Sequence, residues 1–245
     1  MGENALERSM HRTLIAALMV ASWVIGIPAA TSASPPGVNP EELTAGFFET
    51  VFGLEHGQHA DADRVKRFSS TVRFHVSDRS GRGRTEAARR FLHSLPQRIR
   101  HFSGVEVTHP EMANFRILIV RSADFAKVVA RELKADAVAM GARCLVGVTT
   151  ERGQIDHSVA IIVGDDDYLF SRCLVEEVLQ GLGPMNDNDS LGKSVFNDTS
   201  HHTKFTAFDQ AILNVLYHPA IRPGMTTAEA NRALPYALRD LGYAR

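Results

Sequence analysis

The chain has 245 residues, of which 44% are hydrophobic and 22% are charged, and its formal net charge is -1. This length and apolar content are sufficient for one globular domain with a real core. The nearly balanced charge, without long runs of lysine and arginine, argues against a nucleic-acid partner or a polybasic membrane contact, because both depend on clustered cations.

The first 33 residues predict a secretory signal peptide. The basic pair His11-Arg12 precedes the apolar stretch 13–27, and small residues follow up to Ala33. This order is typical of a signal that is cleaved near Ala33, and it predicts a periplasmic or secreted protein. An uncleaved anchor is the alternative, but a bilayer core needs about 20 apolar residues. We expect no membrane span after signal cleavage.

Residues 34–63 are predicted to form a linker and an N-terminal helix. The linker is rich in proline, and after Pro40 the residues Leu43, Phe47 and Val51 recur at helical spacing. We expect this helix to dock on the main domain, which we place at residues 64–245.

The main domain mixes predicted strands and helices. Thr85 and Ser122 are expected to cap their helices, and Gly153 supplies the turn of an antiparallel hairpin. The pattern predicts a single α+β domain with one mixed sheet. The predicted strands are 71–77, 105–109, 115–121, 143–150 and 154–163, and the predicted helices are 85–95, 122–136, 169–182, 206–217 and 226–242.

Cys144 and Cys173 are the only cysteines of the chain. Because export places them in an oxidising compartment, we predict that they form one disulfide. A reactive thiol is the alternative, although no histidine near Cys173 in the sequence could activate it.

The predicted helix 169–182 has two distinct faces when its residues are placed at 100° intervals. Gly183 is expected to end it as a C′ glycine, because the following Pro184 prevents continuation. A solvated surface is the simplest interpretation of the polar face. The apolar face holds Leu174, Val175, Val178, Leu179 and Leu182, and the opposite face holds Cys173, Glu176, Glu177 and Gln180.

Residues 176–187, E-E-V-L-Q-G-L-G-P-M-N-D, overlay the pattern H-E-x-x-H-x-x-G-x-x-H-D. In that pattern two histidines four residues apart hold zinc, and the glutamate between them polarises a water molecule. The chain therefore resembles the metzincin clan of zinc peptidases. The resemblance implies that Glu176, Gln180 and Asn186 stand at the three zinc-ligand positions, and that Glu177 stands at the general base.

Three more positions fit the metzincin resemblance: Gly183 at the turn below the metal, Asp187 at the end of the motif, and Phe196 in a segment that resembles the Met-turn. A hairpin before the helix and helices at the C-terminus also fit a zincin-type fold. Residues 43–225 resemble, more closely still, a bacterial exported family known as domain of unknown function 2927. The residues that carry this second resemblance are C-x-x-E-E-x-x-Q-x-L-G-x-x-N-D from Cys173 and LY-x-P-x-I-R-P-G-M at 216–225.

The replacement of all three histidines predicts that zinc is not bound, because the amide oxygens of glutamine and asparagine are weak zinc donors. Oxygen ligands suit calcium or another hard cation better, and the segments 165–167 and 186–189 supply several. Helix capping and turn formation are the alternative role of these residues.

We therefore expect an inactive relative of a peptidase: an exported, non-catalytic protein of the cell envelope that binds a peptide, an envelope polymer or a protein partner. One alternative is a hydrolase that uses Glu177 as general base with a non-zinc or atypically bound metal. Adjacent glutamates in a cleft can act as an acid and base pair when burial separates their pKa values. A purely structural module of the envelope is a further alternative.

Overall fold

The computed structural model describes residues 37–53, 61–197 and 199–244. The predicted signal peptide and most of the predicted linker lie outside the described residues, so cleavage and export stay predictions. None of the described helices is long and apolar enough to cross a bilayer.

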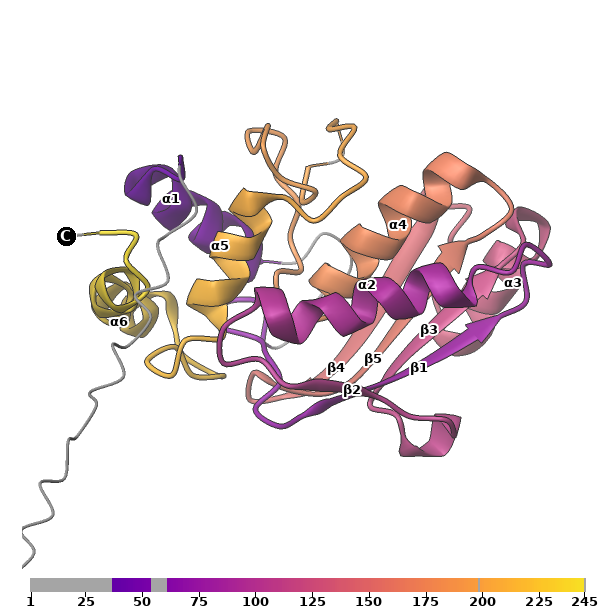
Figure 1. The fold of residues 1–245 in the computed structure, drawn as a ribbon, viewed down its shortest axis with the longest axis horizontal. Helices are drawn as coiled ribbons and strands as arrows, with labels where there is room; N and C mark the ends of the chain where they lie inside the picture. Colours follow the sequence, from indigo (N-terminus) through magenta and orange to yellow (C-terminus); the bar gives the residue numbers. More distant parts are fainter. Residues whose placement is uncertain (1–36, 54–60, 198, 245) are drawn as a thin grey trace, which may run out of the picture. The chain divides into compact units, whose positions relative to one another are not determined.

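The described residues form a mixed α+β domain, as predicted (Figure 1). The strands are β1 (Val72–Asp78), β2 (Gly104–Glu106), β3 (Phe115–Val120), β4 (Cys144–Glu151) and β5 (Gln154–Val163). The helices are α1 (Pro40–Val51), α2 (Thr85–Arg98), α3 (Ser122–Glu132), α4 (Asp167–Gln180), α5 (Ala207–Leu216) and α6 (Thr227–Asp240), and a 3-10 helix, η1, spans Pro110–Met112.

The five strands form one sheet in the order β2-β1-β3-β5-β4. Neighbouring strands are parallel except β4, which pairs with β5 as an antiparallel hairpin. The predicted hairpin is thus confirmed. Its turn needs a glycine, because Gly153 has φ 80° and a Cβ there would lie 2.3 Å from the backbone nitrogen of Gly224.

Alternation along β5 places helices on both faces of the sheet. Ala160 and Ile162 belong to the large core that includes residues of α2 and α4, whereas Ile161 and Val163 pack in a smaller cluster with α3. Successive side chains of a strand point to opposite faces. The sheet therefore separates α4 and α2 on one face from α3 on the other.

Helix α1 packs against α5 and is fixed at both ends. The side chain of Asn39 accepts a hydrogen bond from the backbone nitrogen of Glu41 at 2.7 Å, which caps the first turn. At the last turn, Nζ of Lys66 donates to the carbonyl oxygen of Val51 at 2.9 Å. Gly46 lies so close to α5 that a Cβ there would meet the ring of Phe208 at 2.7 Å.

The predicted helix caps at Thr85 and Ser122 are wrong, because each is the first residue inside its helix. Carboxylates from elsewhere in the chain do the capping. Asp78 accepts from the backbone nitrogen of Arg84 at 2.5 Å, and Asp165 accepts from that of Ser122 at 2.9 Å. The strand predicted at 105–109 is also shorter, since only β2 pairs with β1.

Candidate functional site

Helix α4 begins two residues earlier than predicted because Asp166 caps it, accepting from the backbone nitrogen of Leu169 at 2.8 Å. The helix ends at Gln180 with Gly181 as its C-cap, so the prediction that Gly183 is the C′ residue is wrong. Gly183 has φ 139°, and a Cβ there would lie 2.2 Å from the carbonyl oxygen of Lys66. This glycine is required by the close approach of a second backbone segment.

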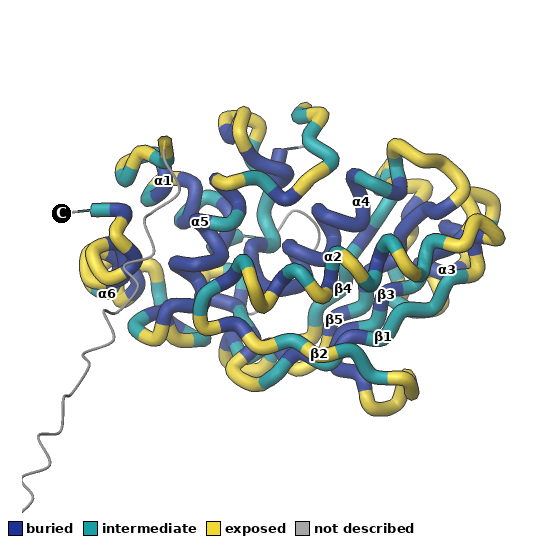
Figure 2. Tube along the Cα trace, viewed as in Figure 1, coloured by how far each residue is buried: buried dark blue, intermediate teal, exposed yellow. Residues whose placement is uncertain are grey.

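Both faces of α4 are buried from Arg172 to Gln180 (Figure 2). The polar face is covered as completely as the apolar one, because β4 lies on one side of it and the loop after α4 lies on the other. The interpretation of this face as a solvated surface is therefore wrong. The exposed fractions are 0% for Cys173, 5% for Glu176, 5% for Glu177 and 3% for Gln180.

The predicted disulfide is confirmed: Cys144 at the start of β4 is bonded to Cys173 in α4. The alternative of a reactive thiol does not hold for this structure, because both cysteines of the chain are in this bond. The bond fixes the polar face of α4 against the first residue of the neighbouring strand.

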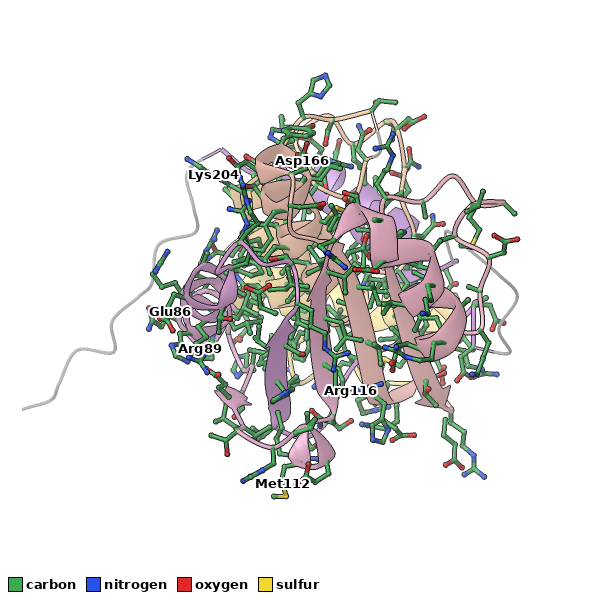
Figure 3. All side chains as sticks on the ribbon, turned by 90° about the vertical axis from the view of Figure 1, so that its right-hand side faces the viewer. Glu86, Arg89, Met112, Arg116, Asp166 and Lys204 are labelled. Atoms are coloured by element: carbon green, nitrogen blue, oxygen red, sulfur yellow. A yellow bond between two sulfur atoms is a disulfide. The ribbon has the colours of Figure 1, made fainter. Side chains whose placement is uncertain are left out.

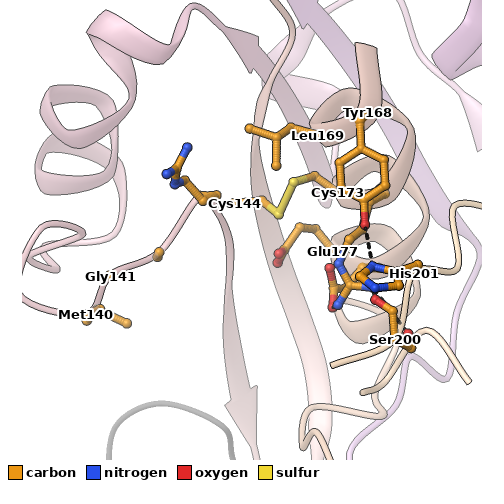
Figure 4. A pocket seen from close by; sticks show the side chains of 13 residues that line it. Met140, Gly141, Cys144, Tyr168, Leu169, Cys173, Glu177, Ser200 and His201 are labelled. Carbon is orange, nitrogen blue, oxygen red and sulfur yellow. Dashed lines mark hydrogen bonds and ion pairs between the residues drawn. A yellow bond between two sulfur atoms is a disulfide. The ribbon is translucent and has the colours of Figure 1, made fainter. Parts of the chain in front are cut away.

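A pocket of about 430 Å³ lies beside the polar face of α4 (Figure 4). At its wall, Glu177 lies next to the disulfide. At its mouth, the hydroxyl group of Tyr168 lies 3.4 Å from Nδ1 of His201. The lining residues come from the segment before β4 (Met140, Gly141, Ala142, Arg143, Cys144), from α4 (Tyr168, Leu169, Arg172, Cys173, Glu176, Glu177) and from the loop after it (Ser200, His201).

Glu176 forms a buried ion pair with Arg172, one helical turn earlier. Nη2 of Arg172 donates to Oε1 of Glu176 at 2.7 Å, and the two side chains are only 10% and 6% exposed. The same guanidinium group donates to the carbonyl oxygens of Asn197 at 3.2 Å and Ser200 at 3.1 Å. Arg172 was not among the site residues predicted from the sequence, although the i, i+4 spacing of arginine and glutamate is a known signal of helical ion pairs.

Glu177 shares the pocket with Glu176. A carboxylate oxygen of each glutamate and Sγ of Cys144 all lie within 4.8 Å of one another. A disulfide sulfur is not a metal ligand in the way that a thiolate is. With the disulfide formed, the pocket therefore offers two carboxylates in one place, without a thiolate.

The other two positions that match zinc ligands have different partners. Nε2 of Gln180 donates to Oδ1 of Asp187 at 2.7 Å. Nδ2 of Asn186 donates to the carbonyl oxygen of Glu49 in α1 at 2.8 Å. Among the described residues, Glu176, Gln180 and Asn186 therefore make hydrogen bonds to three different parts of the chain.

The segment that resembles a Met-turn is tied to the start of α5. Phe196 is fully buried, and its backbone nitrogen donates to Oγ of Ser194 at 3.0 Å. That hydroxyl group donates in turn to Oδ1 of Asp209 at 2.6 Å. Burial raises the pKa of Asp209, while hydrogen bonds from Ser194, Thr206 and Val195 oppose the shift. The turn and α5 thus share one buried carboxylate.

The acidic segments considered as cation ligands take part in capping and turns. Asp165 accepts from Ser122, Asp166 caps α4 at the position that Figure 3 labels, and Asp167 pairs with Arg84. Asn188 accepts from the backbone nitrogen of Ser190 at 2.8 Å. These bonds are those expected of turn residues, and hard-cation binding stays a prediction.

A family profile described as "Protein of unknown function (DUF2927)" matches residues 40–236. The chain belongs to this family. The match begins at the first residue of α1, ends within α6, and contains the whole of α4 and the pocket beside it. The comparison with curated proteins found no match, and neither did the comparison with solved structures.

Proposed function

We propose that this member of the DUF2927 family is an exported, non-catalytic binding protein with a metzincin-like scaffold, and that the pocket beside α4 holds a side chain of an extended peptide. Export rests on the signal-peptide pattern of the first 33 residues. The scaffold rests on the motif at 176–187 and on its location in a helix that follows an antiparallel hairpin.

One observation carries the non-catalytic part of the proposal. Gln180 donates to Asp187 and Asn186 donates to the backbone of Glu49, so two of the three candidate ligand positions are engaged with separate protein groups. A catalytic zinc site needs three converging ligands and an open fourth position.

The position of β4 supports an extended peptide as the ligand. In the sheet formed by the described residues, β4 has a neighbouring strand on one side only. An edge strand can pair with an added peptide strand through backbone hydrogen bonds, while adjacent pockets take alternate side chains. Cys144 belongs both to this edge strand and to the wall of the pocket.

The exposed tyrosine at the pocket mouth allows a direct test. Peptides selected from a random display library are titrated against the wild-type protein and against Tyr168→Ala, with fluorescence anisotropy as the readout. Tyr168 is 47% exposed and lines the pocket, whereas Tyr236 is 57% exposed on α6 and does not line it, so Tyr236→Ala is the matched control. Truncation of a tyrosine that is a binding hot spot weakens binding about tenfold or more.

We expect Tyr168→Ala to lose about tenfold in affinity, Tyr236→Ala to keep the wild-type value, and bound peptide to slow amide hydrogen exchange in β4. Equal effects of the two substitutions, or exchange in β4 that peptide leaves unchanged, would contradict the proposed site. An envelope polymer that binds where peptides do not would replace the peptide as ligand.

A hydrolase with Glu177 as general base is a second candidate, favoured by the oxygens of Glu176 and Glu177 within 4.8 Å in one pocket. When the surroundings of two neighbouring carboxyl groups push their pKa values apart, one group can act as the acid and the other as the base. Elemental analysis and a protease assay of the oxidised protein decide between the two functions. Stoichiometric zinc retained after dialysis, together with cleavage that Glu177→Gln abolishes, would establish the hydrolase and overturn the non-catalytic proposal.

A further inference from the structure

The disulfide of the pocket lies beside two carboxylates, and its reduction would change the chemistry of this site. Sγ of Cys144 and one oxygen from each of Glu176 and Glu177 lie within 4.8 Å of one another. Sγ of Cys173 is bonded directly to Sγ of Cys144, so the second sulfur lies next to this group of three donor atoms. One sulfur and two oxygen donors thus converge beside α4, and the second sulfur is attached to the first.

Helical geometry explains this convergence. Cys173, Glu176 and Glu177 are related by i, i+3 and i, i+4 spacing, which places their side chains on one face of α4. Cys144 reaches that face from β4. The donors come from one helix and a neighbouring strand, and such rigid elements hold ligands more precisely than loops do.

We propose that reduction of the Cys144–Cys173 disulfide creates a binding site for a thiophilic divalent cation such as Zn²⁺, with the two cysteine thiolates and the carboxylates of Glu176 and Glu177 as ligands. Oxidation removes the site by joining its two sulfur ligands. The proposal does not rest on peptide binding, since it needs only these four side chains.

The distances are compatible with a tetrahedral metal. Zinc binds sulfur at about 2.3 Å and carboxylate oxygen at about 2.0 Å, so donors in a tetrahedron lie about 3.3–3.8 Å apart. Donor atoms within 4.8 Å reach this separation by small side-chain rotations. The bond that Arg172 donates to Oε1 of Glu176 is compatible with ligation, because carboxylate ligands are usually held by an outer hydrogen bond.

The chemistry needs a two-electron reductant. A dithiol is oxidised to its own disulfide and supplies two electrons and two protons to the sulfurs of Cys144 and Cys173, which become thiols. A phosphine supplies the two electrons in the same way: it takes the oxygen of one water molecule to become its oxide, and the two protons of that water go to the thiols. A divalent cation then displaces one proton from each thiol as the two metal–sulfur bonds form, so two protons are released for each cation bound. In the absence of metal, the two carboxylates disfavour thiolate formation, which couples ligation to proton release.

The test is a titration with Co²⁺, whose bonds to thiolates give an intense near-ultraviolet charge-transfer absorption. Purified protein is titrated under argon in two forms, oxidised and reduced with a phosphine that contains no thiol. Circular dichroism monitors the folded state of both forms. Glu177→Gln and Glu176→Gln remove the proposed oxygen ligands one at a time, and Glu86→Gln on the outer face of α2 (Figure 3) is the matched control.

We expect the reduced wild-type protein to bind one equivalent of Co²⁺ with the charge-transfer band, and the oxidised protein to show no such band. Loss of one ligand should weaken Co²⁺ binding at least tenfold in Glu177→Gln and in Glu176→Gln, with Glu86→Gln unchanged. Bound Co²⁺ should also raise the thermal midpoint of the reduced wild-type protein, because ligands stabilise the state that binds them.

Three results would overturn the proposal. The first is a reduced, folded protein without the charge-transfer band. The second is a band whose Co²⁺ dependence is the same in wild type, Glu176→Gln and Glu177→Gln, because thiolates alone would then account for it. The third is unfolding of the protein on reduction even with Co²⁺ present.

Discussion

The guanidinium group of Arg172 and the carboxylate of Glu176 form an ion pair on the buried polar face of α4, with Nη2 2.7 Å from Oε1. Each charge has lost most of its contact with water, so each depends on the other for compensation. The pair also joins α4 to the following loop, because Arg172 donates to the backbone of Asn197 and Ser200.

The first prediction concerns the loss of this pair. Glu176→Ala leaves the charge of Arg172 buried without its carboxylate, and we expect the free energy of unfolding in urea to fall by about 3–5 kcal/mol. Glu86→Ala is the matched control, since Glu86 pairs with Arg89 on α2 with side chains 70% and 40% exposed. That exposed pair should contribute little to stability, because solvent screens it. A loss for Glu176→Ala no larger than the control would contradict the assigned burial.

The second prediction concerns Gly183. Gly183→Ala forces a residue with a Cβ into φ 139° and against the carbonyl oxygen of Lys66, 2.2 Å away. We expect about 2–4 kcal/mol of destabilisation in urea unfolding, because both backbone strain and a steric clash must be relieved. At Gly192 no heavy atom would lie within 4 Å of a Cβ. Gly192→Ala should therefore change stability by less than about 0.5 kcal/mol, and a comparable loss at both glycines would refute the argument.

The third prediction is a pH dependence that Lys66 causes. Burial lowers the pKa of Lys66 from 10.5 to about 8, while the carboxylates of Asp61 and Asp63 oppose the shift. Above pH 8 the folded protein has begun to lose a proton that the unfolded chain keeps until about pH 10.5. The free energy of unfolding should therefore rise as the pH increases from about 8 towards 10.5. This gain in stability from the neutral form of Lys66 should be lost again as the pH falls to 8.

Urea unfolding at several values from pH 7.5 to 9.5 measures this slope, and this range stays clear of most tyrosine titration (about pH 10). Lys66→Met should flatten the slope relative to wild type. Lys193→Met is the control, because Lys193 is 63% exposed in its pair with Glu42. If wild type and Lys66→Met have parallel pH profiles, the lowered pKa of Lys66 is wrong.

The fourth prediction concerns the disulfide. Cys144 and Cys173 are 29 residues apart. Closing a loop of that length lowers the conformational entropy of the unfolded chain and so raises its free energy by about 3.5 kcal/mol. The double substitution Cys144→Ala/Cys173→Ala should lower the free energy of unfolding by about this amount in urea. A phosphine reductant should lower the stability of wild type similarly and leave the double variant unchanged. Equal stability of wild type and the double variant would mean that the disulfide does not form in solution.

Much of the fold could be predicted from local patterns. The β4–β5 hairpin was predicted from the alternation of apolar and polar residues on either side of Gly153, and α4 was predicted from the helical spacing of its apolar residues. The positions of helix caps could not be predicted in the same way. Thr85 and Ser122 have side chains that could cap a helix. Asp78 and Asp165, which lie outside these two helices, instead accept hydrogen bonds from backbone nitrogens at the two helix starts.

The sequence by itself determined the family, the mixed α+β class and the pairing of the only two cysteines, because each depends on composition, residue order or spacing along the chain. Only the tertiary structure decided the environment of Glu176, Glu177 and Gln180. A helical wheel identifies a polar face but not what covers it. Here β4, the disulfide and the loop after α4 cover most of that face, so Glu176 and Glu177 are each only 5% exposed at the pocket wall, and Glu176 pairs with Arg172.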